Sequence, residues 1–231
     1  MFVRGLILMI LLSGCSVIKN TPKTELIEGF YWQKNHEKIK KEVYINPQSE
    51  DLYIYPSQQK KVDTSQYIAL LPEMTKLLEN QNKIILNRGG LDIDLLTIPL
   101  KYRSKRIDVP AQINSFLNGA VYLGYRFDKY IIKYQKTPLH LYKREISHYG
   151  FSLGLFSGLG GVFMSPTNTN NILAQEYDGV VWNKGIAGII AIDKFNLGLA
   201  LGFDNLLDKN KNIWIYEGKS WLGLAFGLNL N

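Results

Sequence analysis

The segment Phe195-Asn-Leu-Gly-Leu-Ala-Leu-Gly-Phe203 places a large apolar side chain at every second position. The positions between them hold only asparagine, glycine and alanine. Because successive side chains of a strand point to opposite faces, this period of two predicts a strand with one bulky apolar face and one small face. The same alternation recurs at the carboxyl end and in residues 149–155 and 113–125.

Extended along the chain, the pattern predicts about eight strands. The expected ranges are 82–88, 94–102, 112–126, 146–156, 158–164, 185–192, 195–203 and 220–230. Asp193-Lys194 is expected to form a two-residue hairpin turn, and long polar connections are expected at 127–145, 165–184 and 204–219. Pro99 conflicts with the second strand, because proline has no N–H to donate to a ladder.

The small face distinguishes a membrane barrel from an ordinary soluble sheet. A soluble sheet covers its wet face with charged or threonine-rich residues, whereas this face is mostly Gly, Ala, Asn and Ser. In lipid, the bulky face meets acyl chains and closure of the sheet leaves no backbone group unpaired. The small face then lines a narrow interior, which Phe116 and Tyr122 are expected to fill. The alternative is a soluble, lipocalin-like barrel with its bulky face turned into a ligand cavity.

Residues 81–231 thus resemble small bacterial outer-membrane β-barrels, and residues 198–210 are similar to outer-membrane proteins of Bacteroidota. The resemblance implies an antiparallel up-and-down β-barrel with aromatic residues near the strand ends. It brings no activity to transfer. The chain departs from such barrels in ending Leu230-Asn231, since many of them end in an aromatic residue. The aromatics expected near strand ends are Tyr125, Tyr149, Trp182, Phe203 and Trp221.

The leader carries a separate signal, Leu12-Ser13-Gly14-Cys15, after Arg4 and a short apolar run. A spanning helix needs about 20 apolar residues, so this shorter run predicts a cleaved signal peptide over residues 1–14. The motif resembles the lipobox of bacterial lipoproteins. That resemblance implies cleavage before Cys15 and acylation of its thiol and new amino group, and therefore a lipid-anchored protein of the bacterial outer membrane.

Residues 15–80 are polar, lysine-rich and poor in glycine, and they predict a small α+β periplasmic segment before a barrel domain at 81–231. Short strands are expected at 42–46 and 52–55. A helix is expected from Ser65 to about Glu79, because apolar residues recur there at helical spacing. These residues are Tyr67, Leu70, Leu71, Met74, Leu77 and Leu78.

Composition limits the partners. The net charge is +7, or +6 once Arg4 is lost with the leader. A basic chain often binds nucleic acid, but an exported lipoprotein rarely meets it, so we expect anionic lipid head groups instead. Cys15 is the single cysteine, which excludes an internal disulfide.

The residues that could carry chemistry do not form a recognisable site, and we expect no catalytic, cofactor or metal site. His36, His140 and His148 have no zinc-ligand spacing. His148 and Ser152 share a strand face, but four residues span about 13 Å, whereas a serine and its base lie about 3 Å apart.

Two groups of aspartates have oxygen ligands that a cation could use. Asp92 and Asp94 share a strand face, and Asp204 and Asp208 flank a loop with Asn205 and Asn210. The loop lacks the spacing of a calcium loop and is interrupted by lysines, so it predicts a polar turn.

The sequence therefore predicts a lipid-anchored outer-membrane barrel with a structural or binding role at the cell envelope. The first alternative is a lipoprotein with a soluble β domain that binds a small apolar ligand. The second is an envelope lipid hydrolase or acyltransferase, with His148 as its best residue. An enzymatic role is the less favoured interpretation.

Overall fold

The protein is mainly β in the computed structural model, which describes residues 25–34, 40–77, 83–106, 109–192 and 195–229. Thirteen antiparallel strands join one sheet in this part of the chain. The described residues include two short 3-10 helices, η2 (Thr167–Thr169) and η3 (Lys209–Asn212). The predicted mainly β, antiparallel class is confirmed.

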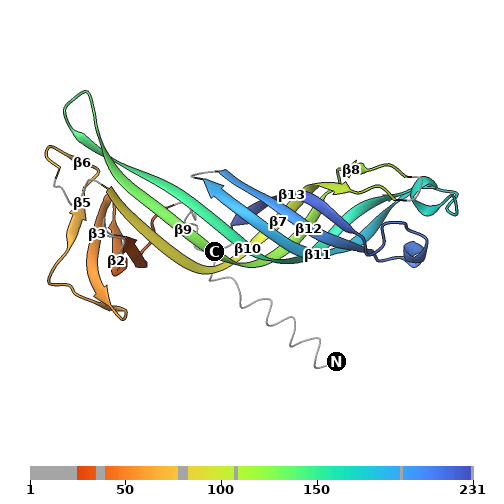
Figure 1. Ribbon diagram of the computed structural model, residues 1–231, viewed down its shortest axis with the longest axis horizontal. Helices are drawn as coiled ribbons and strands as arrows, with labels where there is room; N and C mark the ends of the chain where they lie inside the picture. Colours follow the sequence, from red (N-terminus) through yellow and green to blue (C-terminus); the bar gives the residue numbers. More distant parts are fainter. Residues whose placement is uncertain (1–24, 35–39, 78–82, 107–108, 193–194, 230–231) are drawn as a thin grey trace.

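Six long strands close on themselves. Each pairs with the next along the chain, and the last returns to pair with the first. We call the closed part the ring: β11 to β13, residues 91–103, 118–127 and 149–164. Figure 1 shows its strands running obliquely side by side. The six strands are β7 (Lys83–Arg103), β9 (Asn118–Lys136), β10 (Tyr142–Met164), β11 (Tyr177–Ile192), β12 (Phe195–Leu206) and β13 (Ser220–Asn229).

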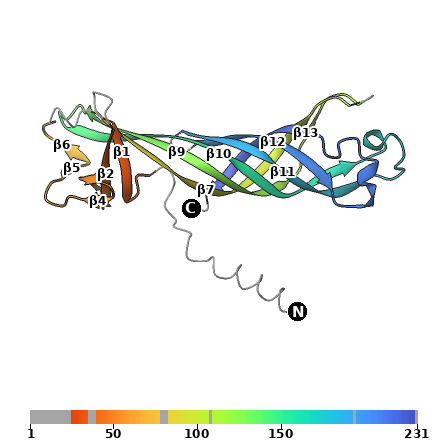
Figure 2. The same cartoon turned by 60° about the horizontal axis from the view of Figure 1, so that its bottom comes forward.

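Strands β7, β9 and β10 continue beyond the ring into a second body, which we call the amino-terminal lobe (residues 25–90 and 128–148). There β7 pairs with β1 (Gly29–Lys34), and the sheet continues through β2 (Lys40–Gln48) and β3 (Asp51–Gln58). Figures 1 and 2 show the lobe at one end of an elongated molecule. The short strands are β4 (Lys61–Val62), β5 (Ile68–Leu70), β6 (Glu73–Met74) and, beside the ring, β8 (Gln112–Asn114).

The predicted division into eight barrel strands is wrong. The ranges 82–88 and 94–102 belong to the single strand β7, and 146–156 and 158–164 belong to β10. The range 112–126 is divided between β8 and β9. The predicted turn at 193–194 lies outside the described residues, although Ile192 pairs with Phe195 on either side of it.

The long connection predicted at 127–145 is also wrong. β9 runs to Lys136 and β10 starts at Tyr142, so only a short turn joins them. Side chains still alternate between the two faces through this region, but here the inward face is apolar and the outward face is charged. Inward residues such as Ile132 are apolar and outward residues such as Lys133 are charged. A search for bulky outward residues therefore ends each strand too early.

The helix predicted from Ser65 to Glu79 is replaced by β5 and β6 in its described part. Pro72 lies between the two strands, and a proline inside a helix loses a backbone hydrogen bond and clashes with the preceding turn. The lobe uses this backbone instead: Tyr134 donates to the carbonyl of Leu71, and the amide of Arg144 donates to Pro72. The strands predicted at 42–46 and 52–55 are confirmed as parts of β2 and β3.

Pro99 marks a bulge in β7. Leu100 pairs with Leu224, but Thr97 pairs with Phe226, so β7 carries one extra residue. The ladder to β9 ends at Thr97, which leaves Pro99 where no N–H is needed. Because one inserted residue reverses which side chains face inward, Lys101 and Arg103 lie inside the ring while Leu100 lies outside.

Candidate functional site: a charged interior inside an apolar shell

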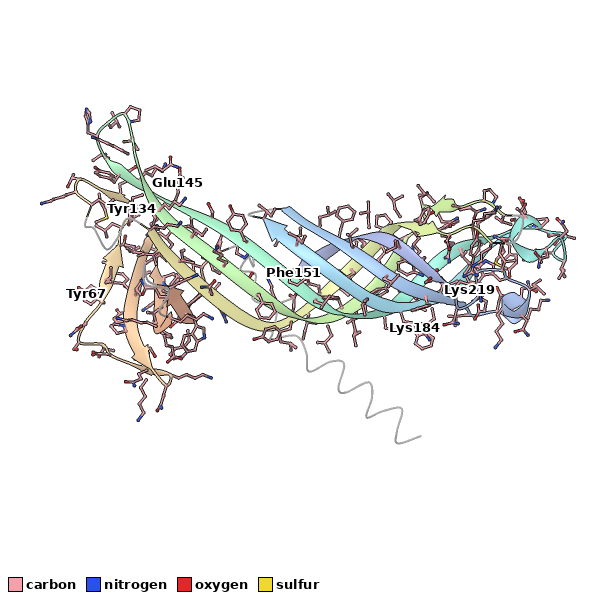
Figure 3. The ribbon with its side chains drawn as sticks, viewed as in Figure 1. Tyr67, Tyr134, Glu145, Phe151, Lys184 and Lys219 are labelled. Atoms are coloured by element: carbon pink, nitrogen blue, oxygen red, sulfur yellow. The ribbon has the colours of Figure 1, made fainter. Side chains whose placement is uncertain are left out.

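The outer surface of the ring is apolar. In Figure 3, Phe151 lies on this surface, whereas Glu145 lies further along the same strand in the lobe. Leu199 is 64% exposed and Leu155 is 65% exposed. The large apolar residues exposed there include Leu91, Leu95, Val121, Leu123, Leu153, Leu159, Val180, Ile186, Ile190, Leu197, Leu201, Leu222 and Phe226.

Aromatic side chains border this surface at both ends. Tyr125, Phe127, Tyr149 and Phe151 lie toward the lobe, and Tyr102, Phe163, Trp182 and Phe203 lie toward the opposite end. Among the described outward-facing residues of the ring, the charged side chains are Asp178 and Lys184, both toward the far border. Asp178 pairs with Phe163, and the Lys184 amine lies 4.0 Å from the centroid of the Trp182 ring. Of the five aromatics predicted near strand ends, Tyr125, Tyr149, Trp182 and Phe203 are exposed at these borders, but Tyr125 and Tyr149 lie in the interior of β9 and β10 and not near their ends. Trp221 is the exception, because it occupies the small-residue face of β13 and is buried.

The middle of the ring is filled. Tyr122 shares a 2.7 Å hydrogen bond with Ser152, and Phe156 packs against Trp221 with ring centroids 5.9 Å apart. Glycine is required beneath two of these rings, since a Cβ at Gly124 would overlap Tyr122 and one at Gly202 would overlap Trp221. The predicted filling role of Tyr122 is confirmed, while half-buried Phe116 lies against Gly161.

A first polar cluster lies where the ring meets the lobe. Asp128 accepts hydrogen bonds from Arg126 Nε at 2.8 Å and is bonded to His148 Nε2 at 2.7 Å. Burial raises the pKa of the Asp128 carboxyl, but these two partners outweigh burial and hold it below its ordinary value. Tyr130 stacks on His148 with ring centroids 4.7 Å apart, and burial raises the pKa of its phenol.

A second polar cluster lies inside the ring near its far end. Lys101 Nζ donates to both carboxylate oxygens of Asp204 at 3.0 Å, and Arg103 Nη2 donates to the same carboxylate. All three side chains are buried. The loop between β12 and β13 covers them, because the Arg103 guanidinium lies 5.1 Å from the Trp214 ring and 5.3 Å from the Tyr216 ring.

The structure does not bring His148 and Ser152 together. His148 is bonded to Asp128, whereas Ser152 is bonded to Tyr122. His140 lies in the turn between β9 and β10, and His36 lies outside the described residues. In the described part of the chain, His148 and Ser152 therefore do not form the pair that nucleophilic catalysis needs.

The two aspartates of the possible cation loop do not face a common site. Asp204 faces the ring interior, while Asp208 accepts a hydrogen bond from the amide of Asn210 and another from Tyr177. Asp92 and Asp94 are buried inside the ring. Among the described residues, no three His, Cys, Asp or Glu side chains gather as metal ligands.

An open cleft of about 520 Å³ lies beside the lobe. Glu25, Glu50, Arg144 and His148 contribute to its lining. Arg144 donates to the carbonyls of Leu70 and Glu50, so its guanidinium already joins β10 to the lobe. The charged group in the cleft therefore has a structural role, because it holds β10 against the lobe.

Sequence reasoning missed both ion clusters. The sequence pattern places Asp204 in a polar loop and gives no role to Lys101, Arg103, Arg126 or Asp128. The bulge at Pro99 is the signal that could have revealed the first two, because it reverses the direction in which the residues after it point. Cys15, the predicted lipidation site, lies outside the described residues.

None of the helices in the described part of the chain is long and apolar enough to span a membrane. Comparison with protein-family models, curated proteins and solved structures finds no match to this chain.

Proposed function

We propose that the ring spans the bacterial outer membrane as a small β-barrel, with the lobe in the periplasm and acylated Cys15 as a second anchor. The protein then has a structural or binding role at the cell envelope. One observation carries this proposal: bulky apolar side chains cover the outside of the ring while its interior holds buried charges. Water-soluble proteins have the opposite arrangement.

The size of the apolar surface supports this location. Soluble monomers rarely expose contiguous apolar patches larger than a few hundred Å², whereas this surface involves all six strands of the ring. Acyl chains accept such side chains without a hydration penalty. Closure of the β7–β13 ladder also satisfies the backbone groups that an open sheet edge would expose to lipid.

The dimensions fit a bilayer. A tilted strand needs about 9–11 residues to cross the hydrocarbon core, and β12 and β13 contain 12 and 10 residues. The two aromatic borders fit the headgroup regions, and Lys184 lies near the outer border, where its amine can reach the interface. Six strands are fewer than the eight of typical small outer-membrane barrels, which agrees with an interior of glycine, alanine and a few large rings.

The alternatives find less support. A lipocalin-like domain needs bulky residues around a cavity, but Leu197, Leu199 and Phe226 are exposed on the outside. A lipid hydrolase needs a nucleophile beside its base, and Ser152 is bonded to Tyr122 instead of His148.

Fractionation of cells that express the full chain tests the two anchors separately. We expect Cys15→Ala to leave the protein in the outer membrane after an alkaline carbonate wash, because the ring alone retains it. Release of the Cys15→Ala protein into the wash, with the parent protein retained, would leave only a lipid anchor. Appearance of the parent protein in the soluble fraction would reject both anchors.

Labelling with a membrane-impermeant maleimide tests the orientation. Lys211 lies in η3 at the far end and Lys60 lies in the lobe, and both are exposed. In intact cells we expect Lys211→Cys to be labelled and Lys60→Cys to be protected until the outer membrane is permeabilised. The reverse pattern would contradict the proposed orientation, and equal labelling of both sites would contradict the membrane-spanning ring.

A further inference from the structure

The second polar cluster carries more positive than negative charge. Within this cluster Lys101 and Arg103 contribute two cations and Asp204 one anion, so its three buried groups sum to +1. The other buried charges of the ring, Asp92, Asp94 and Arg126, lie at strand positions toward the lobe. Arg103 is 2% exposed and Asp204 is fully buried. An uncompensated charge taken out of water is costly, which means that such clusters are normally completed by a counter-charge.

The same cluster also has donors without acceptors. Arg103 uses Nη2 on Asp204, while its Nε and Nη1 atoms have no hydrogen-bond partner among the described residues. The indole N–H groups of Trp214 and Trp221 and the hydroxyl of Tyr216 are likewise unpartnered there. Buried polar groups are almost always satisfied, and exceptions point to a water or an ion.

These groups lie close together. Arg103 contacts the rings of both Trp214 and Tyr216, and Lys101 Nζ lies 4.4 Å from the centroid of the Trp221 ring. On the neighbouring strand, Asn183 pairs with Asp204, and both of its amide atoms are unpartnered in the described chain. The far end of the ring is therefore rich in N–H donors and lined by aromatic rings, with one carboxylate as its single charged acceptor among these residues.

We infer that this cluster binds a small monovalent anion of the halide type, held by the free N–H groups of Arg103 and by neighbouring indole and amide donors. A single negative charge balances the buried +1. Bulky anions such as lipid head groups are excluded, because Arg103 packs against Trp214 and Tyr216, which belong to a buried apolar cluster with Val162, Met164, Val181 and Leu206. The inference concerns the ring interior and holds whether or not the ring lies in a membrane.

The full chain is purified in a detergent that keeps it monodisperse, and its thermal midpoint is measured in sodium gluconate and in sodium chloride at equal ionic strength. Saturation of one site raises the midpoint, and we expect a rise of roughly 5 °C or more in chloride. Equal midpoints in the two salts would mean that trapped water alone satisfies the donors, and would overturn the inference. A rise in sulfate but not in chloride would overturn the monovalent assignment.

Variants locate the effect. We expect Arg103→Gln to remove the chloride dependence. Arg126→Gln is the matched control, since Arg126 is also buried and paired with an aspartate but lies at the other end of the ring, and it should retain the dependence. Persistence of the full chloride response in Arg103→Gln would overturn the inference.

Two further measurements decide the matter if Arg103→Gln does not fold. Trp214→Phe keeps the ring but removes the indole N–H, and it should weaken the chloride response several-fold. Crystals of the parent protein grown in bromide should show an anomalous peak within hydrogen-bond distance of Arg103 Nε or Nη1. Absence of that peak at saturating bromide would overturn the inference.

Discussion

The ring and the amino-terminal lobe share three strands but expose outward faces of opposite polarity. On β9, the outward residues of the ring include Leu123 and Phe127, whereas the next outward residue, Lys129, is charged. Inward residues change in the other direction, from buried Arg126 in the ring to Ile132 in the lobe core. The reversal occurs within a few residues of Phe127.

The difference teaches that strand geometry and side-chain chemistry are independent. The backbone ladder between β9 and β10 continues from Lys136 to Asn118 without a break in register. Only the residue types on each face change, and that change matches a passage from water to hydrocarbon. In our proposal, the membrane surface therefore lies at the level of Phe127 and Tyr149.

The variant with the largest expected effect changes the chain next to the bulge at Pro99. Inserting one alanine between Leu100 and Lys101 shifts the residues after the bulge by one position, so Lys101 and Arg103 would turn outward and Tyr102 inward. We expect no folded protein, seen as loss of the heat-modifiable gel band. Pro99→Ala keeps the chain length and should fold at a cost of about 1 kcal/mol or less. Normal folding of the insertion variant would show that the fold does not depend on the inward orientation of Lys101 and Arg103.

A cavity in the lobe should be more costly than a truncation on the ring surface. Ile132→Ala removes a fully buried side chain from the lobe core and should lower the free energy of unfolding by about 2–5 kcal/mol. Leu197→Ala leaves a space that lipid can fill, and its cost should be below about 1 kcal/mol. Urea unfolding in vesicles measures both, and equal costs would remove the proposed contrast between the two bodies.

A charge on the ring surface distinguishes lipid from water directly. In a bilayer, Leu199→Arg should destabilise the ring by about 2–4 kcal/mol. In water, an arginine at a position that is 64% exposed would change stability by about 0.5 kcal/mol or less. Lys133→Glu on the outer face of the lobe is the control and should be nearly neutral. The refolding yield in lipid vesicles measures the effect of each variant. An unchanged yield for Leu199→Arg would count against the membrane location.

The smallest expected effect concerns acid stability at the junction. Because the folded-state pKa of Asp128 is below its ordinary value of 3.8, its interactions stabilise the fold above that pH. The contribution is lost as the pH falls through the lower folded-state pKa. Asp128→Asn should therefore flatten the decline in stability below about pH 4, measured by thermal melting at stepped pH. Asp178→Asn at the far end is the control, and an unchanged slope in Asp128→Asn would contradict the assignment.

The sequence predicted the bulky and small faces correctly because period-two alternation is a local property. Leu197, Leu199, Leu201 and Phe203 are exposed while Gly198 and Ala200 are buried. The sequence pattern failed where the tertiary structure changed which face of a strand is buried or which face is apolar. The lobe reverses their polarity, which hid the full length of β9 and β10, and Pro72 divided an apolar stripe that resembled a helix.

The ion clusters were beyond the reach of the sequence pattern for a similar reason. Lys101 and Asp204 are 103 positions apart and meet only because the ring closes. Arg103 points inward only because of a one-residue bulge, which a strict alternation rule assigns to the wrong face. The lipobox and its Cys15 stay a prediction from the leader alone.

The continuous strands have a mechanical consequence. β10 contains 23 residues, which corresponds to about 75 Å at 3.3 Å per residue, and it is paired on both sides of the junction. No linker separates the two bodies, so the lobe acts as a stiff lever rather than a tethered domain. A load that tilts the lobe is transmitted as torque along β7, β9 and β10 to the wall of the ring.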